Sequence, residues 1–229
     1  MIIKEKNCIF VHIPKNAGQA IESEILQELG EKWSTREKFL LRKNDNPSMG
    51  PPRLAHLYAS EYLEKGYVDE EYFKGAYKFA VVRNPYARLV SEYRYRAYLC
   101  SFETFVKKKM LKVRDNYDNG KDLRRHLEPQ VKYIFDSDGN KIVDDVFKLE
   151  ELKKVESIFL GKLGMKGGTI KKKNETGEVP ALSIGRVRHL VFKMIYDKGG
   201  DYKKYYNEET RKVVSDVYSC DLKEFQYSY

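Results

Sequence analysis

The sequence contains no long hydrophobic run and few cysteines, and these shortages exclude several classes of protein. None of its 229 residues lies in a stretch approaching the ~18 to 20 apolar residues of a membrane-spanning helix. The N-terminus has neither a long apolar core nor a small-residue cleavage site. The three cysteines, Cys8, Cys100 and Cys220, form no CxxC pair or Cys/His cluster. We therefore expect a soluble, cytoplasmic protein without a disulfide framework or a metal site.

Glycine and proline are also scarce, at 15 and 7 residues, whereas apolar residues make up 41% and aromatic residues 13% of the chain. This composition can bury enough apolar surface to offset the entropy lost on folding, which excludes global disorder. Because the length fits one domain better than two, we expect a single domain over residues 1–229.

Acidic residues are in the minority, since 34 Asp and Glu face 43 Lys and Arg, which gives a net charge of +9. Such a charge attracts anions, including nucleic acid, phosphorylated nucleotides, acidic glycans and anionic lipid surfaces. The sign of the charge restricts the expected partners to anions but does not identify which class of anion binds.

Two segments show a buried strand that leads through a short turn into a helix. Residues 7–13 are almost continuously apolar, as in parallel sheets, and the four-residue apolar spacing over 18–29 predicts a helix. Residues 77–82 predict a second buried strand, followed by Asn84 as N-cap and Pro85 in the first helical turn. The pattern indicates an α/β fold with a central parallel sheet and flanking helices.

The rest of the chain reads as mainly helical. We predict a short strand over 54–59, another near 142–147, an exposed loop over 164–177, and helices over 102–113, 126–135, 149–163 and 207–218.

Each strand-to-helix turn carries a cation where unpaired backbone N–H groups and the positive end of a helix dipole meet. In the first turn, Gly18 permits close backbone approach and Lys15 can reach a phosphate or sulfate oxygen. In the second, Arg83 and Ser91 could share one phosphate. Lys15 could instead be merely solvated, and Arg83 could form a structural ion pair. Together, however, the two turns predict a crevice for a ligand with two anionic groups.

Residues 10–18 (FVHIPKNAG) and 79–93 (FAVVRNPYARLVSEY) resemble the two cofactor signatures of carbohydrate sulfotransferases of the Golgi type, here expected in a soluble form. Weaker similarity runs through 126–130 (HLEPQ), 174–176 (NET) and the C-terminal helix. The resemblance implies a P-loop, nucleotide-kinase-like fold. It also implies in-line, metal-free transfer of a sulfuryl group from 3′-phosphoadenosine 5′-phosphosulfate to a hydroxyl of a saccharide or glycoconjugate.

The same resemblance assigns the nucleotide-binding residues to three segments. They are Lys15, Asn16, Ala17, Gly18, Gln19 and Ala20 in the first turn, Arg83 and Ser91 in the second, and Asn174 and Thr176 in the late loop. Lys15 matches the catalytic lysine at the 5′-phosphosulfate, and Arg83 with Ser91 matches the ligands of the 3′-phosphate. The family usually has Ser or Thr where this chain has Gln19 and Ala20, so the Gln19 amide or backbone N–H groups must replace a hydroxyl donor.

The acceptor hydroxyl needs a general base, and His56 is the first candidate because some family members use a histidine or glutamate between the two signatures. A half-buried structural histidine is the alternative reading, and Glu61 is the second choice of base. His12, inside the first strand, is expected to be structural. His126 and Gln130 are expected to bind the acceptor.

Three other functions stay open at this point. A nucleotide or sugar kinase would normally carry the GxxxxGK[ST] loop, which the chain lacks. A basic nucleic-acid-binding module would normally show a helix-turn-helix, zinc-finger or RNP pattern. A protein that binds the nucleotide without transferring sulfate would have the same two strand-to-helix turns. No motif identifies the acceptor, and both an acidic glycan and an acceptor presented at a membrane surface stay open.

Overall fold

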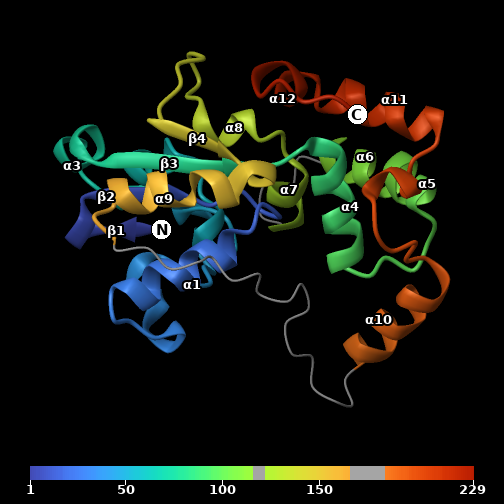
Figure 1. The fold of residues 1–229 in the computed structure, drawn as a ribbon, viewed down its shortest axis with the longest axis horizontal. Helices are drawn as coiled ribbons and strands as arrows, with labels where there is room; N and C mark the ends of the chain where they lie inside the picture. Colours follow the sequence, from blue (N-terminus) through green and yellow to red (C-terminus); the bar gives the residue numbers. More distant parts are fainter. Residues whose placement is uncertain (116–121, 166–183) are drawn as a thin grey trace. The chain divides into compact units, whose positions relative to one another are not determined.

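The computed structural model describes residues 1–115, 122–165 and 184–229 (Figure 1). The chain divides into two compact units, Met1–Arg83 with Asp118–Lys172 and Asn84–Tyr117 with Lys173–Tyr229. A single domain over 1–229 stays a prediction. Among the helices of the described residues, none has the length and apolar character to cross a bilayer.

The first unit is built on a four-stranded sheet in the order β1-β2-β3-β4. The strands are β1 (Ile2–Ile3), β2 (Cys8–Val11), β3 (Tyr77–Val82) and β4 (Asp145–Lys148). The β2–β3 and β3–β4 pairs are parallel, and only the edge strand β1 runs antiparallel. The carboxyl ends of β2 and β3 therefore lie at the same edge, where the two predicted cation-bearing turns begin.

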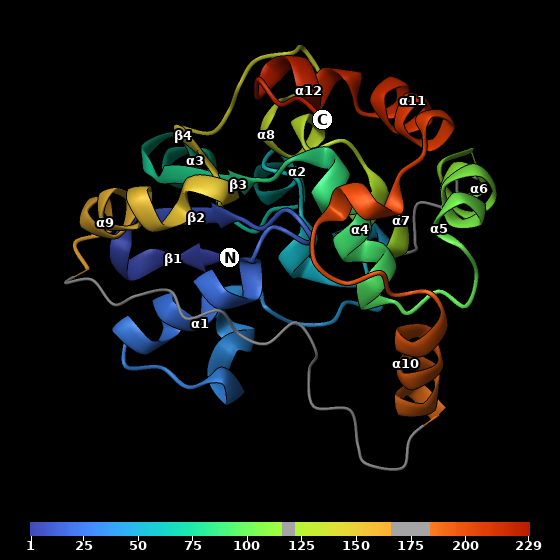
Figure 2. The same cartoon turned by 45° about the vertical axis from the view of Figure 1, so that its right-hand side comes forward.

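Six α-helices of this unit are described. They are α1 (Gly18–Glu28), α2 (Glu61–Glu64), α3 (Glu70–Gly75), α7 (Asp122–Leu127), α8 (Val131–Ile134) and α9 (Leu152–Lys162). Figures 1 and 2 show α1 and α9 beside the sheet. Ile25 of α1 and Leu160 of α9 belong to one buried cluster with Phe10 and Phe79, whose rings are 4.9 Å apart. This core fixes the strands from which the turns emerge.

The predicted α/β architecture is confirmed. The strand over 77–82 has the predicted bounds, and the first strand and helix differ from their predicted ranges by a few residues at the ends. Asn84 caps α4 (Pro85–Tyr95) by accepting a hydrogen bond from the Tyr86 N–H, with Pro85 in the first turn.

Two local predictions were wrong, and one predicted strand is displaced along the chain. Residues 54–56 form a 3₁₀ turn rather than a strand, because the His56 N–H donates to Arg53 O at 3.0 Å instead of to a neighbouring strand. The helix predicted over 126–135 is divided between α7 and α8 around Pro129, which has no N–H to donate. The strand expected near 142–147 begins only at Asp145, where pairing with Phe79 starts.

The second unit is helical in its described part. It contains α4, α5 (Phe102–Thr104), α6 (Leu111–Asp115), α10 (Ile184–Ile195), α11 (Glu208–Val217) and α12 (Ser219–Glu224). A π-helical segment, Phe105–Met110, joins α5 to α6. The Tyr93 ring lies 5.2 Å from Phe102, 5.4 Å from Phe105 and 5.0 Å from Phe192, so aromatic packing forms the core of this unit. Most of the loop predicted over 164–177 lies outside the described residues.

Candidate active site

The first turn, residues 14–18, connects β2 to α1 through two left-handed residues. Lys15 has φ 72° and Ala17 has φ 62°, a conformation that only glycine adopts at little cost. Left-handed residues within a turn direct successive backbone N–H groups to one side, and the N-terminus of α1 adds the positive end of its dipole. With the half-buried Lys15, the turn has the donor set of an anion-binding site.

Asn16 anchors this turn to the neighbouring strand. Its buried side-chain Nδ2 donates to Val81 O of β3 at 2.8 Å and to Gln130 Oε1 at 2.7 Å. These two acceptors fix the orientation of the amide, since a flipped Asn16 would place oxygen against oxygen. Asn16 Oδ1 is buried and has no hydrogen-bond partner within residues 1–115, 122–165 and 184–229.

Gln130 joins the two turns. Its fully buried Oε1 accepts from Asn16 Nδ2 and from the Arg83 N–H at 2.9 Å, while its Nε2 donates to Arg83 O at 2.8 Å. Arg83 Nη1 in turn donates to Lys15 O at 3.3 Å. Gln130 was expected to bind the acceptor, but the structure places its carboxamide between the Lys15 and Arg83 turns. The two cations are thereby held at adjacent strand ends.

Gly18 is required because the His12 ring occupies the space where a side chain would lie. A Cβ on Gly18 would come within 2.1 Å of the imidazole. His12 is held there by Glu22 of α1, whose Oε1 lies 2.6 Å from His12 Nδ1. The His12 ring also meets the His56 ring edge to face, with centroids 5.1 Å apart. His12 therefore connects the first turn to the candidate base, and its buried pairing with Glu22 fits the structural role expected of it.

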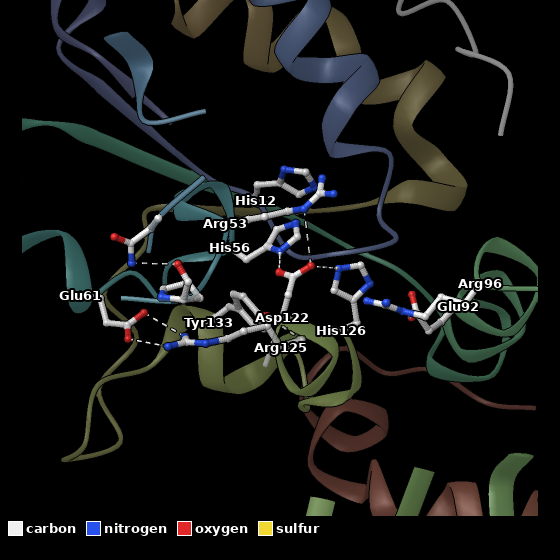
Figure 3. Close-up of polar contacts among 12 residues, drawn as sticks. His12, Arg53, His56, Glu61, Glu92, Arg96, Asp122, Arg125, His126 and Tyr133 are labelled. Carbon is white, nitrogen blue, oxygen red and sulfur yellow. Dashed lines mark hydrogen bonds and ion pairs between the residues drawn. The ribbon is translucent and has the colours of Figure 1, made fainter. Parts of the chain in front are cut away.

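The buried His56 and His126 form a cluster with the half-buried Asp122 (Figure 3). His56 Nδ1 lies 2.6 Å from Asp122 Oδ1, whereas Asp122 Oδ2 lies 3.4 Å from His126 Nε2 and 3.6 Å from Arg53 Nε. The His56 and His126 rings pack edge to face at 4.9 Å. Each carboxylate oxygen of Asp122 thus faces at least one nitrogen of the cluster.

Burial sets the protonation of His56. Desolvation, with smaller contributions from His126 and His12, lowers the pKa of His56 to about 3, although the hydrogen bond to Asp122 opposes the shift. Burial acts to raise the pKa of Asp122, but the hydrogen bonds with His126 and His56 outweigh it and hold that pKa far below its usual range. At neutral pH Asp122 is ionised and accepts from Nδ1–H, so His56 is neutral and carries its lone pair on Nε2.

Glu61, the second candidate base, is already engaged. Both of its carboxylate oxygens accept from Arg125, at 2.6 and 2.9 Å, and Oε2 also accepts the Tyr58 N–H at 2.7 Å. Because both oxygens already accept these hydrogen bonds, neither is directed at an acceptor hydroxyl. The geometry favours His56.

The other predicted site residues lie in different places. His126 is buried inside the cluster, Gln19 is exposed and Ala20 half-buried on the first turn of α1. Ser91 lies on α4 in the second unit. Asn174 and Thr176 lie outside the described residues.

Sequence reasoning missed Asp122. A signal was present, because Asp122 precedes His126 by four residues, a spacing that places both side chains on one face of α7.

The donor atoms of His56, Asp122 and His126 lie within 4.8 Å of one another, and imidazole with carboxylate is a ligand set that divalent metals accept. The cluster already receives positive charge from Arg53, close to Asp122. The absence of a metal from the reaction stays a prediction.

Comparison with protein families matches residues 1–228 to a model described as the sulfotransferase family. The chain belongs to the sulfotransferase family. Comparisons with curated proteins and with solved structures gave no match. Membership implies the P-loop-like fold that the motifs predicted, and it makes the protein a transferase of sulfuryl groups.

The buried, neutral His56 predicts a pH-dependent stability. Unfolded His56 binds a proton below its ordinary pKa of about 6.5, whereas the folded protein leaves it neutral down to about pH 3. Stability from this group is therefore present above pH 6.5 and falls by up to about 1.4 kcal/mol per pH unit below it. Urea unfolding at several pH values should show a shallower decline for His56→Asn, which retains a donor toward Asp122. An unchanged slope would contradict the assignment.

Gln130→Leu should both destabilise the protein and weaken anion binding, because it leaves the Asn16 amide and the Arg83 backbone groups without their shared partner. Each unsatisfied buried group costs about 1–3 kcal/mol, so we expect a loss of several kcal/mol in urea unfolding. Gln27→Leu, an exposed change farther along α1, is the control. A Gln130→Leu protein as stable as the control would show that the hydrogen bonds of the Gln130 side chain are dispensable.

Proposed function

We propose that this sulfotransferase uses 3′-phosphoadenosine 5′-phosphosulfate as donor and a hydroxyl of a saccharide or glycoconjugate as acceptor. The observation that carries the proposal is the continuous contact from the first turn to the base. Gly18 packs on His12, His12 meets His56, and His56 is bonded to Asp122. An anion-binding turn and a neutral, oriented imidazole thus lie together in one compact unit.

The donor carries two anionic groups, and the two turns offer one cation to each. Lys15 and the backbone N–H groups of residues 16–19 suit the phosphosulfate, and Arg83 at the next strand end suits the 3′-phosphate. By resemblance, Ser91 would add a second ligand to the 3′-phosphate, and Asn174 and Thr176 would contact the nucleotide. The observed geometry of the Lys15 and Arg83 turns supports this assignment.

In the proposed reaction the acceptor oxygen attacks sulfur, a new S–O bond forms, and the bond from sulfur to the bridging phosphate oxygen breaks in line. The hydroxyl proton passes to His56 Nε2, and 3′-phosphoadenosine 5′-phosphate leaves with the electron pair. Lys15 stabilises the charge that develops on the leaving oxygen. Asp122 holds the productive tautomer of His56 and stabilises the imidazolium that forms.

The acceptor and its location follow from charge and thiol chemistry. A net charge of +9 favours an acidic glycan over a neutral one. Cys8, Cys100 and Cys220 are all free thiols, and Cys220 is exposed, which fits a reducing compartment such as the cytoplasm.

The donor is tested first, by calorimetric titration with 3′-phosphoadenosine 5′-phosphate beside ADP and Mg²⁺-ATP. We expect micromolar, metal-independent binding that requires the 3′-phosphate. Arg83→Ala should weaken it by about 1.5–3 kcal/mol, the range for hydrogen bonds to charged groups. Arg42→Ala, which removes an exposed arginine, should leave it unchanged. Preference for Mg²⁺-ATP would favour a kinase instead.

The base is tested by turnover with a panel of acidic glycans and labelled donor. His56→Asn should lower turnover by about 10²- to 10⁴-fold, the usual contribution of a general base, with unchanged affinity for 3′-phosphoadenosine 5′-phosphate. Asp122→Asn should also keep nucleotide affinity but lower turnover, because its amide can donate to Nδ1 and so stabilise the wrong tautomer. Wild-type turnover in His56→Asn would remove His56 from the reaction.

A further inference from the structure

Helix α10 presents a row of large apolar side chains to solvent. Val187 is 61% exposed, Leu190 54%, Val191 36%, Met194 84% and Ile195 66%. They follow the i, i+3, i+4, i+7, i+8 spacing that places side chains on one face of a helix. Among the described residues, this one helix holds five of the eleven exposed large hydrophobic side chains. Such concentration marks an interaction surface.

The opposite side of α10 attaches the helix to its own unit. Phe192 is buried against Tyr93 at 5.0 Å, Arg188 Nε donates to Ala97 O at 2.9 Å, and His189 Nε2 lies 3.2 Å from Tyr95 O. The apolar row therefore faces away from the packed side. Figures 1 and 2 both show α10 extending away from α11 and α12.

The charges of α10 select the kind of partner. Lys193 lies on one flank of the apolar row and Arg188 on the other, and the helix contains no acidic residue. A second copy of α10 packed on the row would bring these cations together with no carboxylate from either helix to pair them. Nucleic acid would meet the basic flanks but leave the apolar row without a partner. An anionic lipid surface satisfies both features.

We infer that α10 is an interfacial helix that docks this protein on anionic phospholipid membranes. Val187, Leu190 and Met194 enter the boundary between headgroups and acyl chains, while the flanking Arg and Lys side chains meet lipid phosphates. Its twelve residues lie along the surface and do not span it. The inference does not depend on the proposed donor or acceptor.

The test is vesicle flotation of the full chain with phosphatidylcholine alone and with added phosphatidylserine. We expect binding to the anionic vesicles, at least about tenfold weaker for Leu190→Gln/Met194→Gln, because the row supplies the apolar area. Lys193→Glu should weaken binding severalfold. The matched controls on α9, Ile158→Gln and Lys154→Glu, should bind like the wild type, since Ile158 is likewise exposed.

Three outcomes would overturn the inference. Equal vesicle binding by wild type and Leu190→Gln/Met194→Gln would assign the binding to net charge alone. A wild-type dimer in analytical ultracentrifugation that Met194→Gln dissociates, without vesicle binding, would make the face a self-interface. If the protein neither binds vesicles nor self-associates, the apolar row must instead dock another protein. Circular dichroism of each variant shows that its fold is intact.

Discussion

The site depends on one buried carboxamide. Gln130 accepts from Asn16 and from the Arg83 N–H and donates back to Arg83 O, so one side chain spans the carboxyl ends of β2 and β3. The parallel pairing of these strands brings the two turns to the same edge, but pairing ends at Val11 and Ala80. Beyond that point the Gln130 amide supplies hydrogen bonds that a longer ladder would otherwise make, and Lys15 and Arg83 stay in register.

The same Gln130 carboxamide supports a strained turn. Left-handed residues such as Lys15 and Ala17 each cost of the order of 1 kcal/mol, and a buried hydrogen bond returns a similar amount. The stabilisation from the three hydrogen bonds of Gln130 is thus comparable with the conformational free energy that the strained turn costs. A turn whose N–H groups are fixed before an anion arrives spends little binding energy on ordering them. That preorganisation offers a physical reason why Gln19 and Ala20 can stand where a hydroxyl is usual.

Local features could be predicted from the sequence, and distant contacts could not. The strand over 77–82 and the Asn84 cap follow from runs and caps that are contained in a few neighbouring residues. Gln130 lies 114 residues from Asn16 and 47 from Arg83, and Asp122 lies 66 residues from His56. The spacing of residues within one element gives no information about such distant pairs. The wrong prediction of a strand around His56 has the same cause. An apolar run does not reveal whether its backbone hydrogen bonds go to a neighbouring strand or stay within a local turn.

In the proposed mechanism, the burial that keeps His56 neutral also makes its protonated form expensive. Desolvation favours the neutral imidazole at rest and opposes the imidazolium that proton transfer would create. Asp122 resolves this conflict, because its carboxylate is already ionised and bonded to Nδ1 before the proton reaches Nε2. Arg53, near the other carboxylate oxygen, keeps the resting cluster from carrying an uncompensated negative charge. The His56–Asp122 pair thus carries one negative charge at rest, which Arg53 offsets, and it gains its full attraction only when His56 becomes charged, which is the stage at which stabilisation speeds a reaction.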